Sequence, residues 1–166
     1  MARILVAYAT KHHSTAEIAQ AIADELRSRG HDADCLDVHD AHARGYDAVV
    51  LGSAVYMGRW RREARRFLSH ESDILALTPF WVFSTGPVGE PKSAPDEDEK
   101  WLEPEAVIAQ AEALNVREHV VFGGRMPRDP HGFIESSMAR NTPEEFQDLR
   151  DWEQIRAWAA KIAAQL

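Results

Sequence analysis

Residues 1–30 read MARILVAYATKHHSTAEIAQAIADELRSRG, and this stretch decides the fold. It contains a strand-length apolar run, Ile4–Ala9, followed by the polar loop Thr10–Thr15. Beyond the loop, apolar residues recur every three to four positions, which predicts a helix over Thr15–Arg29 that Gly30 ends. A strand, a polar loop and an amphipathic helix in this order are the first unit of an α/β fold.

Three further runs have the composition of buried strands. They lie at Ala48–Gly52, Phe80–Thr85 and His119–Gly123, and they are apolar at nearly every position. Strands that helices cover on both faces of a parallel sheet have this composition. A fifth run, Asp34–Val38, alternates polar and apolar residues, which predicts a strand at the edge of the sheet.

Helical patterns separate these strands. Their apolar stripes consist of Trp60, Ala64, Phe67 and Leu68, then Val107, Ile108, Ala111 and Leu114, and finally Trp152, Ile155, Ala159, Ile162 and Leu166. The alternation of strand and helix predicts an α/β fold in which a doubly wound, five-stranded parallel sheet carries helices on both faces. We expect a single domain covering residues 1–166.

The remaining connections differ in length. Only a turn or a short piece of helix is expected between Val38 and Asp47. Two long loops are expected at Gly86–Pro104 and Arg125–Asn141, the second with a helical turn near Ser136–Arg140.

Composition excludes several classes of protein. The formal net charge of −8 argues against nucleic acid as a partner, because phosphate binding needs a basic surface. No apolar run is long enough to span a membrane, so we expect no integral membrane segment. The single cysteine, Cys35, excludes an internal disulfide and a multi-cysteine metal site. With no pattern of a secretory leader, the expected location is cytoplasmic.

The loop after the first strand has the features of a phosphate site. Ser14 followed three residues later by Glu17 is the pattern of a capping box, so the helix should begin here with its amides and positive dipole end facing the loop. Thr10, Ser14 and Thr15 add hydroxyl groups, and Lys11 adds a positive charge. This combination suits a phosphate dianion. The alternative interpretation is that Ser14 only caps the helix.

Two more loops should lie at the same edge of the sheet. Gly52–Trp60 carries two glycines and the aromatic residues Tyr56 and Trp60, which can stack on a planar ring or simply pack. Ser84–Gly89 is rich in small residues, so its amides could face a heteroaromatic edge, although it could equally be a plain turn. Because carboxyl ends of parallel strands meet at one edge, all three loops should converge on one ligand.

The sequence contains three further candidate groups. The residues that could ligate a metal are His31, Asp32, Asp34, Asp37, His39, Asp40 and His42. They are spread along one strand and its exit, so we interpret them as a solvated edge and expect no metal site. The basic residues Arg59, Arg61, Arg62, Arg65 and Arg66 have two interpretations: a solvated face paired with glutamates, or a site for substrate carboxylates or an acidic partner. Cys35 is interpreted as a core residue, and no catalytic side chain is expected.

The chain resembles the flavodoxin family. Val6–Thr10, with the loop and helix start that follow it, is similar to the family's flavin mononucleotide (FMN) phosphate loop, Ser/Thr-x-Thr-Gly-x-Thr. Tyr46–Ser53 is similar to the third strand and flavin loop. Within the family, the spacing of Gly52 and Gly58 and the sequence Asp-Trp-Glu-Gln at 151–154 most resemble the flavodoxin-like, menaquinone-dependent protoporphyrinogen dehydrogenases. The chain departs from the family at His13, which stands where the phosphate loop has glycine.

The resemblance implies strand order 2-1-3-4-5 and an FMN-binding redox protein of the electron-transfer or oxidoreductase type. Its partner would be a redox protein or a small-molecule or quinone acceptor. One alternative is a protoporphyrinogen dehydrogenase, and another is a binding module that has lost FMN. The implied cofactor residues are Thr10, Lys11, His12, His13, Ser14 and Thr15, then Ser53, Ala54, Val55, Tyr56, Met57 and Gly58, and finally Ser84, Thr85, Gly86, Pro87 and Gly89.

Overall fold

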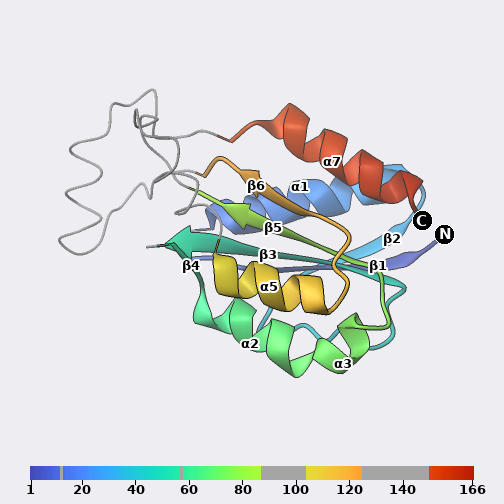
Figure 1. Cartoon of the computed structure of the whole chain (residues 1–166). Coiled ribbons are helices and arrows are strands. Elements are labelled where there is room, and N and C mark those ends of the chain that lie inside the picture. The colour runs from blue at the N-terminus through green and yellow to red at the C-terminus, as the bar shows by residue number, and fades with distance from the viewer. Residues whose placement is uncertain (12, 57, 87–103, 125–149) are drawn as a thin grey trace, which may run out of the picture.

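The computed structural model describes residues 1–11, 13–56, 58–86, 104–124 and 150–166 (Figure 1). Its elements are β1 (Arg3–Ala9), α1 (Ser14–Ser28), β2 (Asp32–Asp37), β3 (Ala48–Tyr56), β4 (Arg59–Trp60), α2 (Arg62–His70), α3 (Ser72–Leu75), β5 (Phe80–Thr85), α5 (Glu105–Ala113), β6 (His119–Phe122) and α7 (Trp152–Ala164). Five parallel strands follow the order β2-β1-β3-β5-β6, and β4 pairs antiparallel with β3. Counting only the parallel strands, this is the expected order 2-1-3-4-5.

Helices cover both faces of this sheet, as the alternating pattern predicts (Figure 1). On one face, α1 and α7 pack over a buried cluster that contains Val6, Phe83 and Trp158. On the other face, α2, α3 and α5 pack over a second cluster that contains Leu51 and Val82. The continuous apolar runs of β1, β3 and β5 supply side chains to both clusters in alternation, which is why those runs show no polar face.

The third strand is longer than the sequence indicates. It continues past the expected end at Gly52 to Tyr56, where the chain turns and returns as β4. Trp60 therefore lies in β4, paired with Val55, and not on the helix whose stripe it was expected to begin. Ser53 ends the apolar run but does not end the strand, because it is paired with Ala9 of β1 on one side and with Ser84 of β5 on the other.

Other boundaries agree with the expected ones to within one or two residues. The segment between Val38 and Asp47 contains only turns and bends, as expected. At α7, the Asp151 carboxylate accepts a hydrogen bond from the Gln154 amide at 3.1 Å and so caps the helix. Most of the loop expected at Gly86–Pro104 and all of that at Arg125–Asn141, with its helical turn, lie outside the described residues.

Cys35 lies half-buried in β2 against the cluster under α1 and α7, which fits its interpretation as a core residue. Burial raises the pKa of this thiol to about 11, with a smaller opposing effect from Arg27. The neutral thiol is thus favoured in the folded state. Its stabilising contribution is fully present below the unfolded-state pKa and is lost as the pH rises through about 11.

The alkylation rate of Cys35 should reveal this raised pKa. Because the thiolate is the reactive form, we expect the rate with iodoacetamide to rise about tenfold per pH unit until the pH approaches 11. At pH 8 the folded protein should react about 100-fold more slowly than the urea-unfolded chain. Cys35→Ser is the unlabelled control, since the chain has one cysteine. A rate that levels off near pH 9 would contradict the burial effect.

Candidate functional site

The candidate site lies at the carboxyl edge of the sheet, where β1, β3 and β5 end. Between β1 and α1, the residue that precedes the helix is His13, which takes the left-handed conformation with φ 64° and ψ −6°. Few residues other than glycine adopt this conformation, so it is what the family's loop glycine would provide. His13 therefore reaches the backbone geometry that glycine would provide at this position, although it carries a Cβ.

The capping box expected at Ser14 is not formed. His13 is the N-cap, no side chain caps the helix, and the Glu17 amide donates to the His13 carbonyl. The Glu17 side chain instead pairs with Arg150, whose guanidinium also lies over the Trp152 ring at 4.8 Å. The capping box is not formed because the N-cap is His13, so that Ser14 is already the first residue of the helix, and the Glu17 carboxylate pairs with Arg150 instead.

Two hydroxyl groups in this loop are buried and have no partner. Thr10 Oγ1 and Ser14 Oγ are both inaccessible to solvent, and neither makes a hydrogen bond in the described part of the chain. An unsatisfied buried hydroxyl costs about 1–3 kcal/mol. Ser14 is the first residue of α1, whose first amides have no intrahelical acceptor, and Thr10 begins the loop that leads from β1 to this helix. A bound anion at this point would satisfy both hydroxyls and the amides together.

One hydrogen bond ties the first loop to the end of β5. Thr15 Oγ1 and Thr85 Oγ1 lie 2.7 Å apart and both residues are buried. Because β3 lies between β1 and β5, this bond crosses over the end of β3 on the α1 face of the sheet. It brings two of the three predicted loops together, as the sequence interpretation requires.

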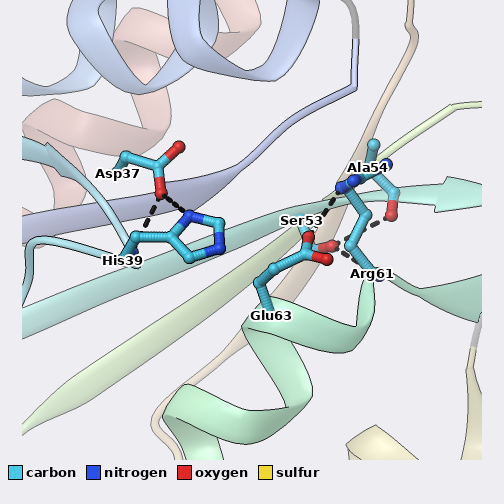
Figure 2. Close-up of polar contacts among 6 residues, drawn as sticks. All are labelled: Asp37, His39, Ser53, Ala54, Arg61 and Glu63. Carbon is cyan, nitrogen blue, oxygen red and sulfur yellow. Dashed lines mark hydrogen bonds and ion pairs between the residues drawn. The ribbon is translucent and has the colours of Figure 1, made fainter.

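The Ser53 hydroxyl forms hydrogen bonds with the protein's own backbone. Figure 2 shows this hydroxyl accepting from the Arg61 amide at 3.0 Å and donating to the Ala54 carbonyl at 2.9 Å. The Arg61 side chain pairs with Glu63 at 2.9 Å (Figure 2). The Ser53 side chain thus holds the chain between β4 and α2 against β3, and its backbone is paired in the sheet between Ala9 of β1 and Ser84 of β5.

The Ser84 hydroxyl likewise forms its hydrogen bonds within the protein, on the face of the sheet that α2 covers. It accepts from Trp60 Nε1 at 2.8 Å and lies 2.9 Å from His119 Nε2. Trp60 is 2% exposed, so it packs inside the protein and does not stand at the rim of the site. This chain of hydrogen bonds from β4 through β5 to β6 was not anticipated, because it joins three segments that are far apart in sequence.

Three glycines of the predicted loops are explained by the structure, each in a different way. At Gly52, a Cβ would lie 2.0 Å from the Phe83 ring, so this position is small because of core packing. Gly58 takes φ 74° in the turn between β3 and β4. Gly86 takes φ 121°, and its amide donates to the Phe122 carbonyl at the end of β6.

Sequence reasoning missed Gly124. A Cβ at this position would lie 3.1 Å from the Gly86 Cα, so the ends of β5 and β6 approach through two glycines. The signal was present as a pair of glycines directly after a buried strand.

The other predicted site residues are either exposed, half-buried or outside the described part of the chain. Lys11 is exposed, and Ala54 and Val55 are half-buried at the end of β3. The placements of His12, Met57, Pro87 and Gly89, and the side chain of Tyr56, lie outside the described residues. The described part of the site therefore consists of the ends of β1, β3 and β5 and the start of α1.

The histidines and carboxylates near β2 do not form a metal site. In the described part of the chain, no group of three or more His, Cys, Asp or Glu side chains lies close enough to hold a metal ion. Asp37 instead accepts from the His39 amide at 2.9 Å and lies 2.6 Å from its ring Nδ1 (Figure 2). Among the described helices, none is both long enough and apolar enough to cross a bilayer.

Comparisons with known proteins agree with this geometry. The sequence profile described as a flavodoxin domain matches residues 5–145. Protoporphyrinogen IX dehydrogenase (quinone) from Escherichia coli (strain K12) is 28% identical over 85 residues, which are 49% of this chain and 47% of that protein. The chain thus matches about half the length of this curated relative.

Solved structures show the same fold over the whole chain. Oxidised flavodoxin 1 from Bacillus cereus has a TM-score of 0.65 at 17% identity, and the match covers 99% of each chain. Flavodoxin 2 from the same organism has a TM-score of 0.63 at 19% identity, again over 99% of each chain. The profile match spans most of the sequence, and the strand order of the sheet agrees with it. The chain belongs to the flavodoxin domain family.

Proposed function

We propose that this protein binds FMN noncovalently at the carboxyl edge of the sheet and works as a flavin-dependent redox protein in the cytoplasm. The observation that carries the proposal is the pair of buried hydroxyls, Thr10 Oγ1 and Ser14 Oγ, which have no partner in the described chain. A phosphate dianion accepts hydrogen bonds only, so it is the complement of two hydroxyl donors and a helix N-terminus.

The phosphate would be held by Thr10, Ser14 and the first amides of α1, with Lys11 adding positive charge in a chain of net charge −8. His13 supports this role through its backbone, because its left-handed conformation turns the loop into the helix. The hydrogen bond between Thr15 and Thr85 holds the phosphate loop against the end of β5.

The isoalloxazine ring would lie between the loops that follow β3 and β5. The hydroxyls of Ser53 and Ser84 point into the α2 side of the sheet and are occupied there, so backbone groups at these strand ends would face the ring. When bound, the flavin supplies the redox chemistry, while the protein binds, orients and shields it. No catalytic side chain is required for that division of roles.

Titration with FMN and with riboflavin tests the proposal. We expect FMN fluorescence to be quenched with a Kd of about 1 µM or tighter, and the purified protein to be yellow if the cofactor is retained. Riboflavin lacks the phosphate, so it should bind at least about 100-fold more weakly. A colourless protein that leaves FMN fluorescence unchanged would favour the alternative of a binding module that has lost the flavin.

The same titration with His13→Gly addresses that alternative directly. Since His13 already adopts the conformation that glycine favours, we expect the Kd for FMN to change by less than about threefold. If the glycine variant binds FMN far more tightly than the natural chain, the imidazole obstructs the phosphate and our interpretation of the loop is wrong.

A porphyrinogen substrate is the second candidate, favoured by the partial match to protoporphyrinogen IX dehydrogenase (quinone). Anaerobic turnover of protoporphyrinogen IX with a menaquinone acceptor distinguishes it from electron transfer between proteins. Catalysed oxidation that depends on added FMN would establish the dehydrogenase, and FMN binding without turnover would leave the electron-transfer protein.

A further inference from the structure

Helix α2 presents an exposed row of arginines. Ala64, Phe67 and Leu68 are buried against the sheet, which leaves Arg62, Arg65 and Arg66 exposed on the opposite side at i, i+3 and i+4. Arg59, in β4 just before the helix, is exposed as well. We call these four residues, Arg59, Arg62, Arg65 and Arg66, the arginine face.

No carboxylate in the described part of the chain pairs with the arginine face. None of its four members forms an ion pair with any residue that the structure describes, whereas Arg61, in the same segment, pairs with Glu63 at 2.9 Å. Other exposed arginines of the chain do find carboxylates, such as Arg27 with Asp24 and Arg29 with Glu25. The interpretation of this segment as a solvated, glutamate-paired face therefore holds for Arg61 only.

Charge is distributed unevenly along this chain. Residues 59–66 contain five arginines and one glutamate, a formal charge of +4, so the other residues sum to −12 against the total of −8. A local positive patch of this size creates a positive surface potential on an otherwise acidic protein. It therefore attracts partners with a negatively charged surface. All five cations are arginine, whose guanidinium binds carboxylates in a bidentate geometry that lysine lacks.

We propose that the arginine face docks an acidic protein partner, through side-chain carboxylates clustered on that partner's surface. Arg62 to Arg66 spans only about 6 Å along the helix axis, which matches a local cluster of carboxylates. A membrane or a nucleic acid presents an extended plane or rod of phosphate instead. Such a surface would also meet the −12 charge of the remaining residues and be repelled by it.

The position of the face suits a partner that exchanges electrons, and this part of the inference rests on the proposed function. Arg59 pairs with Tyr56 at the turn beyond the carboxyl end of β3, and Figure 1 shows α2 beginning at the same end of the sheet. An acidic protein seated on the arginine face would thus lie beside the loop proposed to flank the flavin ring. Steering by opposite charges speeds such encounters and makes them sensitive to salt.

Binding of a short fluorescein-labelled peptide of alternating glutamate and serine tests the docking surface without any flavin. We expect the full-length protein to bind it at least about tenfold more tightly than the same peptide with glutamine in place of glutamate. Raising NaCl from about 20 to about 200 mM should weaken binding by at least about tenfold. Because FMN is not involved, a failure of this test is separable from a failure of flavin binding.

The decisive variant is Arg62→Gln/Arg65→Gln/Arg66→Gln, which should lose at least about tenfold in peptide affinity. Its matched control is Arg29→Gln/Arg44→Gln/Arg156→Gln, which changes the net charge equally at exposed positions outside the arginine face and should stay within about twofold. The triple arginine-to-lysine variant at 62, 65 and 66 should retain salt-dependent binding, since it keeps the charge.

Equal losses in the two glutamine variants would overturn the proposal, because net charge and not the face would then control binding. The proposal is also overturned if phosphatidylglycerol vesicles or oligodeoxythymidine bind more tightly than the glutamate peptide and lose binding with the same face variant. That result would assign the arginines to a phosphate surface.

Discussion

Replacing Gly52 by alanine should destabilise the protein by about 3 kcal/mol or more. The added Cβ would lie 2.0–2.4 Å from three atoms of the Phe83 ring, far inside any real contact. Phe83 cannot move aside easily, because it is fully buried and its ring packs against those of Phe122 and Trp158, with centroids 5.8 and 6.0 Å away. Urea unfolding followed by circular dichroism measures the change.

Two comparisons isolate the steric cause. Gly52→Ala combined with Phe83→Leu should recover part of the lost stability, because the smaller side chain makes room for the Cβ. Gly45→Ala places a Cβ where no atom lies within 4 Å, at φ 89°, so it should cost only about 1 kcal/mol of backbone strain. If Gly52→Ala cost less than about 1 kcal/mol, the described packing of Phe83 against β3 would be incorrect.

The double variant Thr10→Val/Ser14→Ala should weaken FMN binding by about 100-fold, or about 2.7 kcal/mol. It removes the two buried hydroxyls proposed to donate to the phosphate. In the absence of FMN, the variant should be as stable as the parent or about 1 kcal/mol more stable. The reason is that the substitutions remove two buried hydroxyls that have no partner and therefore destabilise the parent. Fluorescence titration gives the affinity, and thermal unfolding of the FMN-free protein gives the stability.

These opposite signs distinguish a binding site from a structural one. Ser28→Ala with Thr78→Val removes two hydroxyls that bond to the carbonyls of Glu25 and Ile74, away from the phosphate loop. This control should lose a little stability and leave the Kd for FMN unchanged. If the Thr10/Ser14 variant instead lost stability and kept its affinity for FMN, the two hydroxyls would have a structural role only.

Where sequence reasoning erred, a distant segment was involved. Ser14 and Glu17 form a capping pattern locally, but Glu17 pairs with Arg150 from the far end of the chain. Trp60 continues the helical spacing of Ala64, Phe67 and Leu68, yet it lies in β4 with its indole bonded to Ser84. Residues that look alike in a loop, such as Ser14 and Ser53, have different environments because their neighbours in space differ.

The sequence alone predicted the parallel sheet and the alternation of its five strands with the helices that cover both faces. These follow from periodicity and from continuous apolar runs, which depend on neighbours a few positions away. Only the tertiary structure decided which hydroxyls remain unsatisfied, that His13 takes a left-handed conformation, and that Gly52 is required by the Phe83 ring. Each of these depends on contacts between strands or on the closing of a loop, and the physical cause is packing between residues that are remote in sequence.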